Sequence, residues 1–416
     1  MTPDMRDIAR QSKAAAAVVA TLSTDAKNAC LLDLADRLSR SGDAIRAANG
    51  KDLAVARDAG LGDAKLRRLA LTETAIRQMA DGLRQVASLP DPVGQVTRNY
   101  TVPSGLTVRK VRCPIGVILM IYEARPNVTV DAFALCFKAG NACILKGGRE
   151  AIHSNEVLAR LAHDALQAKR VPTGALALLT TSDRDEIREL LEYEEYIDLV
   201  IPRGGASLIR FVHEHSRIPT VQHFHGVCHV YVDEAADLGK ALEICATAKT
   251  SAPATCNAAE CILIHENVAK TFVPRLVERY VRDGVEVRGD ETVCSLAAGN
   301  ARPAAEDDWG REFLDLIVAV RVVPDLDAAV GHIHRYGSNH TDAIVTEDGI
   351  VAGRFLNRVQ SSCTLVNAST RFNDGFQLGL GAEIGISTSK IHAYGPMGLE
   401  ELTAQRYLVR GSGQTR

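Results

Sequence analysis

The chain has 416 residues, of which 46% are hydrophobic and 24% charged, and its 48 Lys and Arg residues nearly balance 51 Asp and Glu residues, for a net charge of -3. A length well above the roughly 150 residues of one domain predicts two or three domains with large cores. Near-neutral charge without a basic stripe argues against a nucleic-acid partner. The apolar stretch 14–20 is far shorter than the ~20 residues that span a bilayer, so we expect an amphipathic helix there, with no signal peptide and no membrane partner.

The ten cysteines include no CxxC pair and form no tight framework. This usage is typical of the reducing cytoplasm, where we expect the protein to reside. Seven cysteines lie in apolar runs, where a thiol behaves as a small buried hydrophobic group: Cys113, Cys136, Cys143, Cys228, Cys245, Cys261 and Cys363.

Residues 1 to about 90 are expected to be helical, because Leu and Val recur at three- and four-residue spacings, and this spacing continues without a break through Arg46. From Val96 to Arg112, Thr, Val and Tyr alternate with polar residues around Pro103-Ser-Gly105. This pattern predicts two strands joined by a turn. A hairpin this polar is expected to pair with another element.

From Pro114 onward, short β-branched runs alternate with helical stretches, which is typical of parallel, doubly wound sheets. The first run predicts strands at 115–122, 142–146, 176–180 and 196–201, and helices at 128–139 and 150–168. The second run predicts strands at 228–232, 261–265, 316–322 and 342–346, and helices at 235–249, 268–281 and 326–336. The fold class is therefore α/β, with two such domains in series. The tail 402–410 is expected to be a strand that pairs with the hairpin, in the same subunit or across a dimer.

Cys256 lies in a loop of small residues, Ser251 to Glu260, between a predicted helix and a predicted strand. Such a cysteine is exposed enough to react, although a loop cysteine can also have no function. A thiol with a pKa of about 8.5 is only a few per cent thiolate at pH 7, so a working nucleophile needs a local positive potential or oriented amides.

The loop Tyr122-Glu-Ala-Arg-Pro-Asn127 follows the first strand of the α/β region, and ligands of such folds bind at the carboxyl ends of the strands. Asn127 can direct its amide toward a ligand or serve as a helix N-cap. Arg125 is a candidate contact for a substrate carboxylate, although pairing on a helix surface is an equal alternative.

Two further loops place a cation beside paired glycines, where backbone amides can receive phosphate groups. They are Lys146-Gly147-Gly148 and Arg203-Gly204-Gly205, and together they favour a dinucleotide. The glycines at 379, 381 and 385 follow the second α/β run and are rejected as a nucleotide motif. His223, His225 and His229 lack zinc-type spacing, so no metal is expected.

Several motifs of the chain resemble the gamma-glutamyl phosphate reductase branch of the aldehyde dehydrogenase superfamily, which acts in proline biosynthesis. The similarity runs from about residue 10 to the end. It is carried by Pro114-Ile-Gly-Val-Ile118, Tyr122 to Asp131, Ala139 to Gly148, the loop around Cys256, Tyr336-Gly337 with Thr341 to Glu347, Arg371-Phe-Asn-Asp-Gly375 and Gly379 to Ser387.

The resemblance implies a fold and a set of roles. The fold would be aldehyde dehydrogenase-like, with an NADP(H)-binding domain (1–94 and 113–225), a catalytic domain (226–390) and a small β oligomerisation element (95–112 and 391–416). Cys256 would be the nucleophile, and Asn127 would hold the oxyanion with the backbone N–H of Cys256. The cofactor would contact Lys146 and Gly147, the Arg203-Gly204-Gly205 loop and, at the nicotinamide ribose, Glu312.

The resemblance further implies NADPH-dependent reduction of L-glutamyl 5-phosphate to L-glutamate 5-semialdehyde, through a thioester on Cys256. Hydrolytic relatives carry a glutamate in a Glu-Leu-Gly-Gly stretch, whereas this chain has His223-Phe-His-Gly226 there. Without that general base, phosphate is expected to replace water as the acceptor. Alternatives are a hydrolytic aldehyde dehydrogenase of another substrate, a cofactor-free thiol hydrolase and a catalytically silent binding protein. A homodimer or homotetramer and a transient association with glutamate 5-kinase are the expected protein partners.

Overall fold

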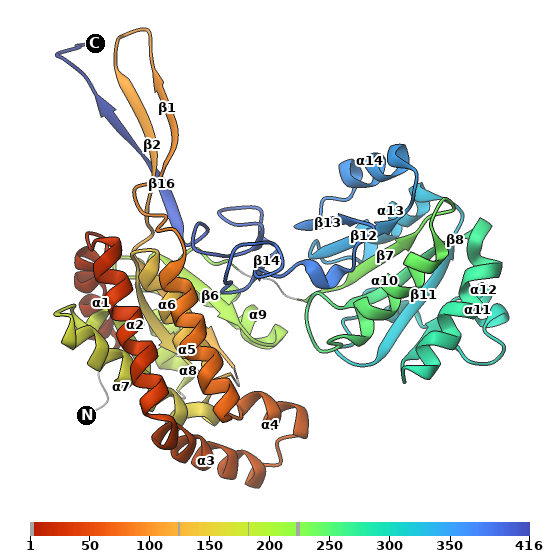
Figure 1. Ribbon diagram of the computed structural model, residues 1–416, viewed down its shortest axis with the longest axis horizontal. Coiled ribbons are helices and arrows are strands. Elements are labelled where there is room, and N and C mark those ends of the chain that lie inside the picture. Colours follow the sequence, from red (N-terminus) through yellow and green to blue (C-terminus); the bar gives the residue numbers. More distant parts are fainter. Residues whose placement is uncertain (1–3, 124, 182, 222–224) are drawn as a thin grey trace. The chain divides into compact units, whose positions relative to one another are not determined.

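The computed structural model describes residues 4–123, 125–181, 183–221 and 225–416 (Figure 1). It contains two compact units, each described here by itself. The first unit comprises Met1–Gln222, Gly379–Gly385 and Met397–Arg416, and the second comprises His223–Leu378 and Ile386–Pro396. The segment Gly379–Gly385, assigned from the sequence to the catalytic domain, thus belongs to the first unit. Its glycines allow close packing there, since Gly381 lies against Leu89 and Gly385 against the Arg203 guanidinium.

Five helices open the first unit: α1 (Met5–Val19), α2 (Thr24–Arg40), α3 (Gly42–Asp58), α4 (Asp63–Leu69) and α5 (Glu73–Ser88). The expected helical character of this region is confirmed, and the spacing that continues through Arg46 is divided among separate helices, the first of which ends at Val19. Ser23 then caps α2 by accepting a hydrogen bond from the Ala26 amide, and Thr72 caps α5 in the same way. A side-chain cap satisfies backbone donors that have no partner within the helix, so it fixes where each helix begins.

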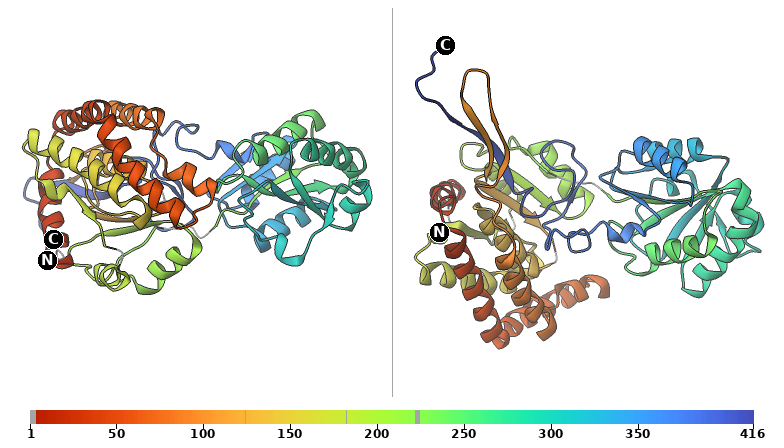
Figure 2. Two further views of the ribbon diagram at one scale, coloured as in Figure 1. Left: turned by 90° about the horizontal axis from the view of Figure 1, so that it is seen from below. Right: turned by 45° about the horizontal axis from the view of Figure 1, so that its top comes forward.

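A four-stranded parallel sheet forms the core of the first unit, in the order β5-β4-β3-β6. Its helices cover both faces (Figure 2); α1, α8 and α9 supply the apolar side chains on one of them. The strands are β3 (Val117–Tyr122), β4 (Ala142–Lys146), β5 (Leu176–Leu179) and β6 (Leu199–Arg203). The helices along this part of the chain are α6 (Asn127–Lys138), α7 (Ile152–Ala168), α8 (Arg184–Leu190) and α9 (Ala206–His215). Two 3-10 turns lie at Arg149–Ala151 and Thr173–Ala175.

A seven-stranded sheet, with every pairing parallel, forms the core of the second unit, in the order β10-β9-β11-β8-β7-β12-β13. Helices α10 and α11 pack on one face, and α13 and α14 on the other (Figure 1). The strands are β7 (Cys228–Val232), β8 (Ala259–His265), β9 (Glu286–Gly289), β10 (Arg302–Pro303), β11 (Ile317–Val323), β12 (Thr341–Val345) and β13 (Cys363–Val366). The helices are α10 (Leu238–Thr250), α11 (Glu266–Arg282), α12 (Glu291–Leu296), α13 (Leu326–Tyr336) and α14 (Gly349–Arg358), with 3-10 turns at Glu306–Asp308 and Thr370–Phe372; β14 (Ile386–Ser387) and β15 (Gly395–Pro396) form a small antiparallel pair.

The hairpin and the tail form a separate antiparallel sheet in the first unit. Strands β1 (Val96–Thr101) and β2 (Thr107–Pro114) are joined by β16 (Thr403–Arg410), which pairs along the whole of β2. The tail therefore pairs with the hairpin of its own chain, one of the two possibilities left open by the sequence. Apolar side chains remain exposed on this sheet, among them Val96, Tyr100, Tyr407, Leu408 and Val409.

The cysteines largely follow the sequence-based expectation. Five of the seven cysteines in apolar runs are buried, but Cys113 and Cys363 are partly exposed, so the expectation is wrong for these two. Cys363 begins the edge strand β13, and edge strands have a neighbouring strand on one side only, whereas Cys113 lies near the end of β2, the central strand of a small three-stranded sheet. Across the described residues, none of the helices combines the length and the apolar character needed to cross a membrane.

Candidate active site

The loop that carries Cys256 connects α10 to β8 and is shaped by its own hydrogen bonds. The Thr255 hydroxyl donates to the Ala252 carbonyl at 2.8 Å, and the Ala258 amide donates to the Thr255 carbonyl at 3.0 Å. Asn257, directly after the cysteine, is buried and donates its side-chain amide to the Asn373 carbonyl at 2.9 Å. Cys256 itself is partly exposed. A fixed backbone with an accessible thiol is the arrangement that a nucleophile requires.

Gly226 packs directly on the backbone of Cys256. A Cβ atom at Gly226 would lie 2.0 Å from the Cys256 carbonyl oxygen, a distance that side-chain carbons essentially never adopt. The two segments meet because β7 and β8 are parallel and Cys228 pairs with Ala259, so the residues before each strand share one edge of the sheet. Glycine at position 226 is therefore required by close backbone approach.

The buried thiol of Cys228, the first residue of β7, contacts the same carbonyl oxygen of Cys256. Cys228 Sγ lies 3.2 Å from the Cys256 carbonyl oxygen. Burial raises the pKa of Cys228 well above its ordinary value, so this group stays protonated and can donate. On the next residue, His229 Nδ1 lies 2.8 Å from Asp342 Oδ1. Cys228 and His229 thus have separate partners, as expected for neighbours on a strand.

Two carboxylates near Gly226 and the start of β8, those of Glu312 and Glu260, already have hydrogen-bond partners in the protein. Glu312 accepts a hydrogen bond from the Gly226 amide at 2.9 Å, and burial raises its pKa. Glu260 is buried and pairs with the buried Lys249 at 2.6 Å, and it also accepts from the Leu314 amide at 3.3 Å. Burial raises the pKa of Glu260 to about 7 and lowers that of Lys249. The contact between Glu312 and Gly226, which lie far apart in the sequence, was not expected from the sequence.

The predicted cofactor loops of the first unit lie at one edge of its sheet. Ile121 pairs with Lys146, and Tyr122 pairs with Arg203, so β3, β4 and β6 end side by side. Lys146 is half-buried, and burial lowers its pKa, an effect opposed by Glu150 and Glu123. The parallel register thus brings together the two glycine loops that the sequence singled out.

A small pocket marks one of these loops. It is lined by Gly147, Gly148 and Arg149 after β4 and by Thr180 and Thr181 after β5, with Ile152, Asn155, Leu178 and Leu179. A Cβ atom at Gly147 would lie 2.2 Å from the Asn155 side-chain amide, so a larger residue would displace this buried side chain. Paired glycines beside residues with hydroxyl groups suit a phosphate-bearing ligand. The two threonines were not predicted from the sequence, although they lie at the end of a predicted strand, where ligands of parallel sheets bind.

The second glycine loop, Arg203-Gly204-Gly205, differs from the first because it contacts a carboxylate. The Gly205 amide, at the start of α9, donates to Glu123 Oε2 at 3.0 Å, and a Cβ atom at Gly204 would lie 2.6 Å from the same carboxyl group. A carboxylate therefore occupies the helix N-terminus at which phosphate groups were expected. Arg203 lies against Gly385. Contacts of this loop with a cofactor stay a prediction.

Asn127 is the first residue of α6, and Pro126 occupies the N-cap without a side-chain bond. The alternative that Asn127 caps the helix is therefore wrong. Its amide donates to Asp131 Oδ2 at 2.9 Å, and burial raises the pKa of Asp131 to about 6. Arg125 lies exposed in the preceding loop. Asn127 and Cys256 belong to different units, so a shared oxyanion site stays a prediction.

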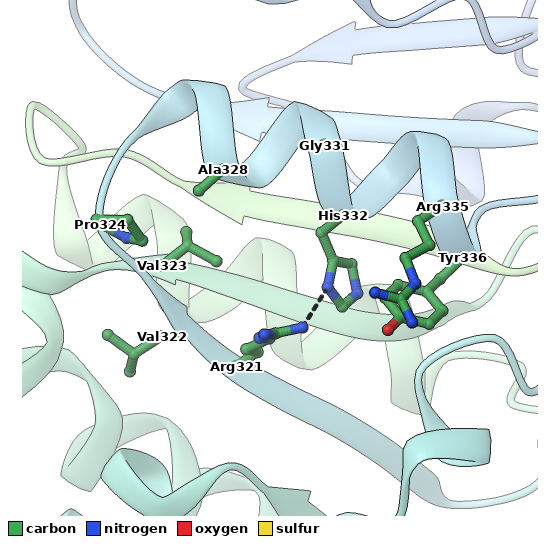
Figure 3. A pocket seen from close by; sticks show the side chains of 9 residues that line it. All are labelled: Arg321, Val322, Val323, Pro324, Ala328, Gly331, His332, Arg335 and Tyr336. Atoms are coloured by element: carbon green, nitrogen blue, oxygen red, sulfur yellow. Dashed lines mark hydrogen bonds between the residues drawn. The ribbon is translucent and has the colours of Figure 1, made fainter.

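A pocket in the second unit contains none of the predicted site residues. It has a volume of about 290 Å³ and lies between α13 and β11 in the second unit (Figure 3). It is lined by Arg321, Val322, Val323, Pro324, Ala328, Gly331, His332, Arg335 and Tyr336.

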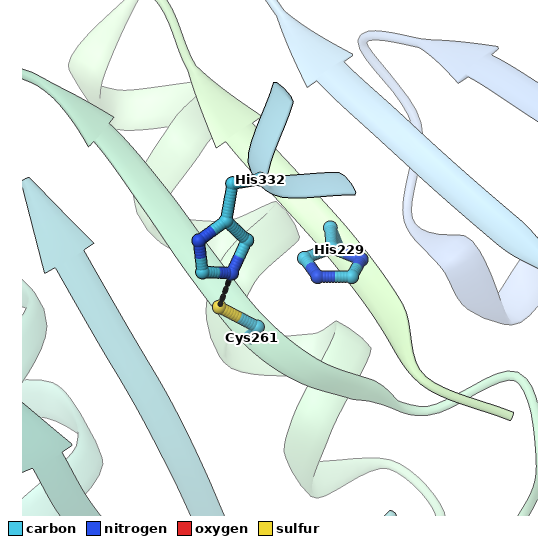
Figure 4. Close-up of side chains that lie close together, drawn as sticks. All are labelled: His229, Cys261 and His332. Carbon is cyan, nitrogen blue, oxygen red and sulfur yellow. Dashed lines mark hydrogen bonds between the residues drawn. The ribbon is translucent and has the colours of Figure 1, made fainter. Parts of the chain in front are cut away.

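His332 connects this pocket to a buried cluster with His229 and Cys261 (Figure 4), whose candidate metal-binding atoms lie within 4.8 Å of one another. Arg321 donates to His332 Nδ1 at 3.2 Å, so a neutral His332 carries its proton on Nε2, which lies 3.6 Å from Cys261 Sγ. Burial lowers the pKa of His332 to about 2, which keeps the ring neutral. A metal at Nε2 would have to replace this proton close to a guanidinium, so we interpret the cluster as hydrogen-bonded core.

Comparison with known proteins identifies the family. The family model described as aldehyde dehydrogenase family matches residues 2–295. The gamma-glutamyl phosphate reductase of Geotalea daltonii is 53% identical over 412 residues, which cover 99% of this chain and 98% of that protein. The crystal structure of gamma-glutamyl phosphate reductase from Thermotoga maritima is 41% identical and superposes with a TM-score of 0.97, covering 99% of this chain and 100% of that chain.

A more distant structure shares the fold alone. An engineered glycolyl-CoA reductase with bound NADP+ is 15% identical, has a TM-score of 0.68, and covers 98% of this chain and 97% of that chain. These matches agree with the α/β fold of two parallel sheets described above. The chain belongs to the aldehyde dehydrogenase family and, within it, to the branch of the gamma-glutamyl phosphate reductases.

Proposed function

We propose that the protein reduces L-glutamyl 5-phosphate to L-glutamate 5-semialdehyde with NADPH and releases phosphate, a step of proline biosynthesis. The observation that carries this proposal is the partly exposed Cys256 thiol on a backbone held by Gly226 and Cys228. The full-length similarity to relatives named for this reaction supports the choice of substrate.

Cys256 acts as the nucleophile in this proposal. Its thiolate attacks the acyl carbon, the bond between that carbon and the phosphate oxygen breaks, and phosphate leaves with the electron pair, so that a thioester remains. NADPH, when bound, supplies the hydride that reduces the acyl group, and the carbon–sulfur bond then breaks to release the aldehyde. The Cys256 backbone N–H and the Asn127 amide would stabilise the oxyanion, and one such donor typically contributes about 3 kcal/mol.

Residues of both units would hold the cofactor. In the first unit these are Lys146 and Gly147 and the Arg203-Gly204-Gly205 loop. In the second, Glu312 would contact the nicotinamide ribose. The glycine cradle at Gly147, with its neighbouring threonine hydroxyls, supports a phosphate-bearing ligand. We assign NADP(H) as this ligand.

Phosphate is the proposed acceptor of the acyl group in the oxidative direction. In the segment where hydrolytic relatives carry a glutamate, residues His223 and Phe224 lie outside the described residues, and His225 and Gly226 provide no carboxylate. The nearby Glu260 and Glu312 are already engaged with Lys249 and the Gly226 amide. A water molecule would therefore lack an available general base.

The test is the oxidation of the semialdehyde, in equilibrium with pyrroline-5-carboxylate, followed by NADPH absorbance. We expect turnover that requires NADP and consumes phosphate stoichiometrically. Cys256→Ala should abolish turnover and leave NADPH binding, measured by fluorescence titration, nearly unchanged. Turnover without phosphate would instead favour a hydrolytic aldehyde dehydrogenase, and absence of NADPH binding would favour a thiol hydrolase or a binding protein. An active Cys256→Ala enzyme would refute the mechanism.

We further propose that the protein is a cytoplasmic homodimer or homotetramer. The exposed apolar side chains on the sheet of β1, β2 and β16 support an interface there, because such surfaces favour protein contacts. A transient association with glutamate 5-kinase would protect the labile acyl phosphate. Arg125 remains a proposed contact for the substrate carboxylate.

A further inference from the structure

The motif Arg371-Phe-Asn-Asp-Gly375 has no role in the mechanism above, yet it lies against the nucleophile loop. Arg371 Nη1 donates to the Thr255 hydroxyl at 2.8 Å and also to the Asn257 side-chain oxygen. Asn257 in turn donates to the Asn373 carbonyl at 2.9 Å. The guanidinium thus contacts the residue before and the residue after Cys256. These contacts lie within the second unit.

Within the described residues, no ion pair neutralises the charge of Arg371. A guanidinium has five N–H donors, and hydrogen bonds within the described chain engage Nη1 alone, while the buried Nε has no partner. Among the described residues, no carboxylate oxygen lies within 4.0 Å of Arg371. The nearby Asp374 instead accepts from the Phe376 and Gln377 amides at 3.0 and 3.3 Å. A half-buried cation whose Nη2 group has no partner among the described residues is stabilised by an anion, and phosphate is an anion that arginine binds well.

We infer that Arg371 forms the phosphate subsite of the enzyme, an inference that rests on the proposed function. In the reducing direction, the phosphate that leaves when Cys256 forms its bond to the acyl carbon departs as an anion beside the guanidinium. In the oxidising direction, a phosphate oxygen held there attacks the thioester carbon, the carbon–sulfur bond breaks, and the Cys256 thiolate leaves. No oxidant or reductant is needed for either exchange.

Proximity selects the phosphate over the substrate carboxylate as the anion at this position. Arg371 is hydrogen-bonded to the side chains of residues 255 and 257, so it lies against the loop that carries the sulfur. The phosphate is joined to the reacting carbon through one oxygen, whereas the α-carboxylate is several carbons further along the substrate. The anion beside the thiol is therefore the one that is transferred.

The experiment compares Arg371→Gln and Arg371→Lys with the wild type in the oxidative direction. We expect Arg371→Gln to raise the KM for inorganic phosphate by about 10- to 100-fold, as expected for the loss of charge-assisted hydrogen bonds, and Arg371→Lys to raise it less. The burst of NADPH formed in the first turnover without phosphate should stay within about twofold. Inorganic phosphate should protect the wild-type thiol, but not Arg371→Gln, from alkylation by iodoacetamide.

Three outcomes would overturn the inference. The first is an unchanged KM for phosphate in Arg371→Gln. The second is a raised KM for the aldehyde alone, which would assign Arg371 to the substrate carboxylate. The third is a change confined to the pH dependence of Cys256 alkylation, which would make Arg371 an activator of the thiolate. Arg354→Gln, which removes an exposed arginine paired with Asp327 in the same unit, is the matched control. If Arg371→Gln fails to fold by circular dichroism, Arg371→Lys decides. Wild-type enzyme that turns over without phosphate would reject the proposed function itself, whatever the variants do.

Discussion

Replacing Gly226 with alanine tests the backbone packing that positions Cys256. The added Cβ atom would lie 2.0 Å from the Cys256 carbonyl oxygen, 2.8 Å from its carbonyl carbon and 2.9 Å from its Cα atom. Since real Cβ atoms essentially never come within 3.0 Å of such atoms, the carbonyl oxygen must move by about 1 Å relative to residue 226. Both backbone segments are held in place, because the Gly226 amide donates a hydrogen bond to Glu312 and the Cys256 carbonyl accepts one from the Cys228 thiol.

A displacement of about 1 Å at a reacting group can cost about 100-fold in rate, and we expect a loss of that order in kcat for Gly226→Ala. The measurement is NADPH oxidation with acyl phosphate, or NADP reduction in the presence of phosphate, together with the rate at which iodoacetamide alkylates Cys256. Gly353→Ala is the control, since that glycine lies within helix α14 and an added Cβ atom there meets nothing within 4 Å. A Gly226→Ala enzyme with the kcat of the control would refute the reasoning.

Two further predictions concern stability. Burial lowers the pKa of His332 to about 2. Below pH 6.5 the unfolded chain therefore takes up a proton that the native state does not. The free energy of unfolding should fall by about 1.4 kcal/mol for each unit by which the pH is lowered. His332→Gln should flatten this slope in urea unfolding between pH 7 and pH 5, and an unchanged slope would contradict the buried neutral ring. Glu260→Gln leaves the buried Lys249 ammonium without its counter-ion and should cost about 3–5 kcal/mol in the same unfolding assay. Glu347→Gln breaks the exposed pair with Lys240 and should cost at most about 1 kcal/mol; equal losses would argue against the role of burial.

Much of the secondary structure follows from local sequence patterns. Strands Ala142–Lys146 and Cys228–Val232 and helix Leu326–Tyr336 have the predicted bounds. These elements are strongly periodic or continuously apolar, and their limits coincide with glycine, aspartate or a polar turn. The prediction for 196–201 is less accurate, since β6 spans Leu199–Arg203. Residues Glu194 to Tyr196 form a turn before the strand, and the strand continues through Pro202 because pairing with β3 outweighs its low strand propensity.

The candidate site was only partly predictable. Cys256 could be located because a loop of small residues between a helix and a strand leaves a side chain accessible. The carboxyl-edge rule also placed the glycine loops after β4 and β6. That rule does not extend to the second unit, where Cys256 precedes β8 and lies at the amino edge of the sheet. The contact of Arg371 with residues more than a hundred positions earlier has no local signature.

The sequence by itself determined the α/β class, the serial order of the two sheets and the residues with the chemistry of a nucleophile and a phosphate cradle, because periodicity and residue type are local properties of a chain. The tertiary structure decided which of these residues have partners. It places Gly226 against Cys256, Glu123 on the Gly205 amide and Arg371 beside the nucleophile loop. Such pairings depend on strand order and register, which bring distant segments together only when the core packs.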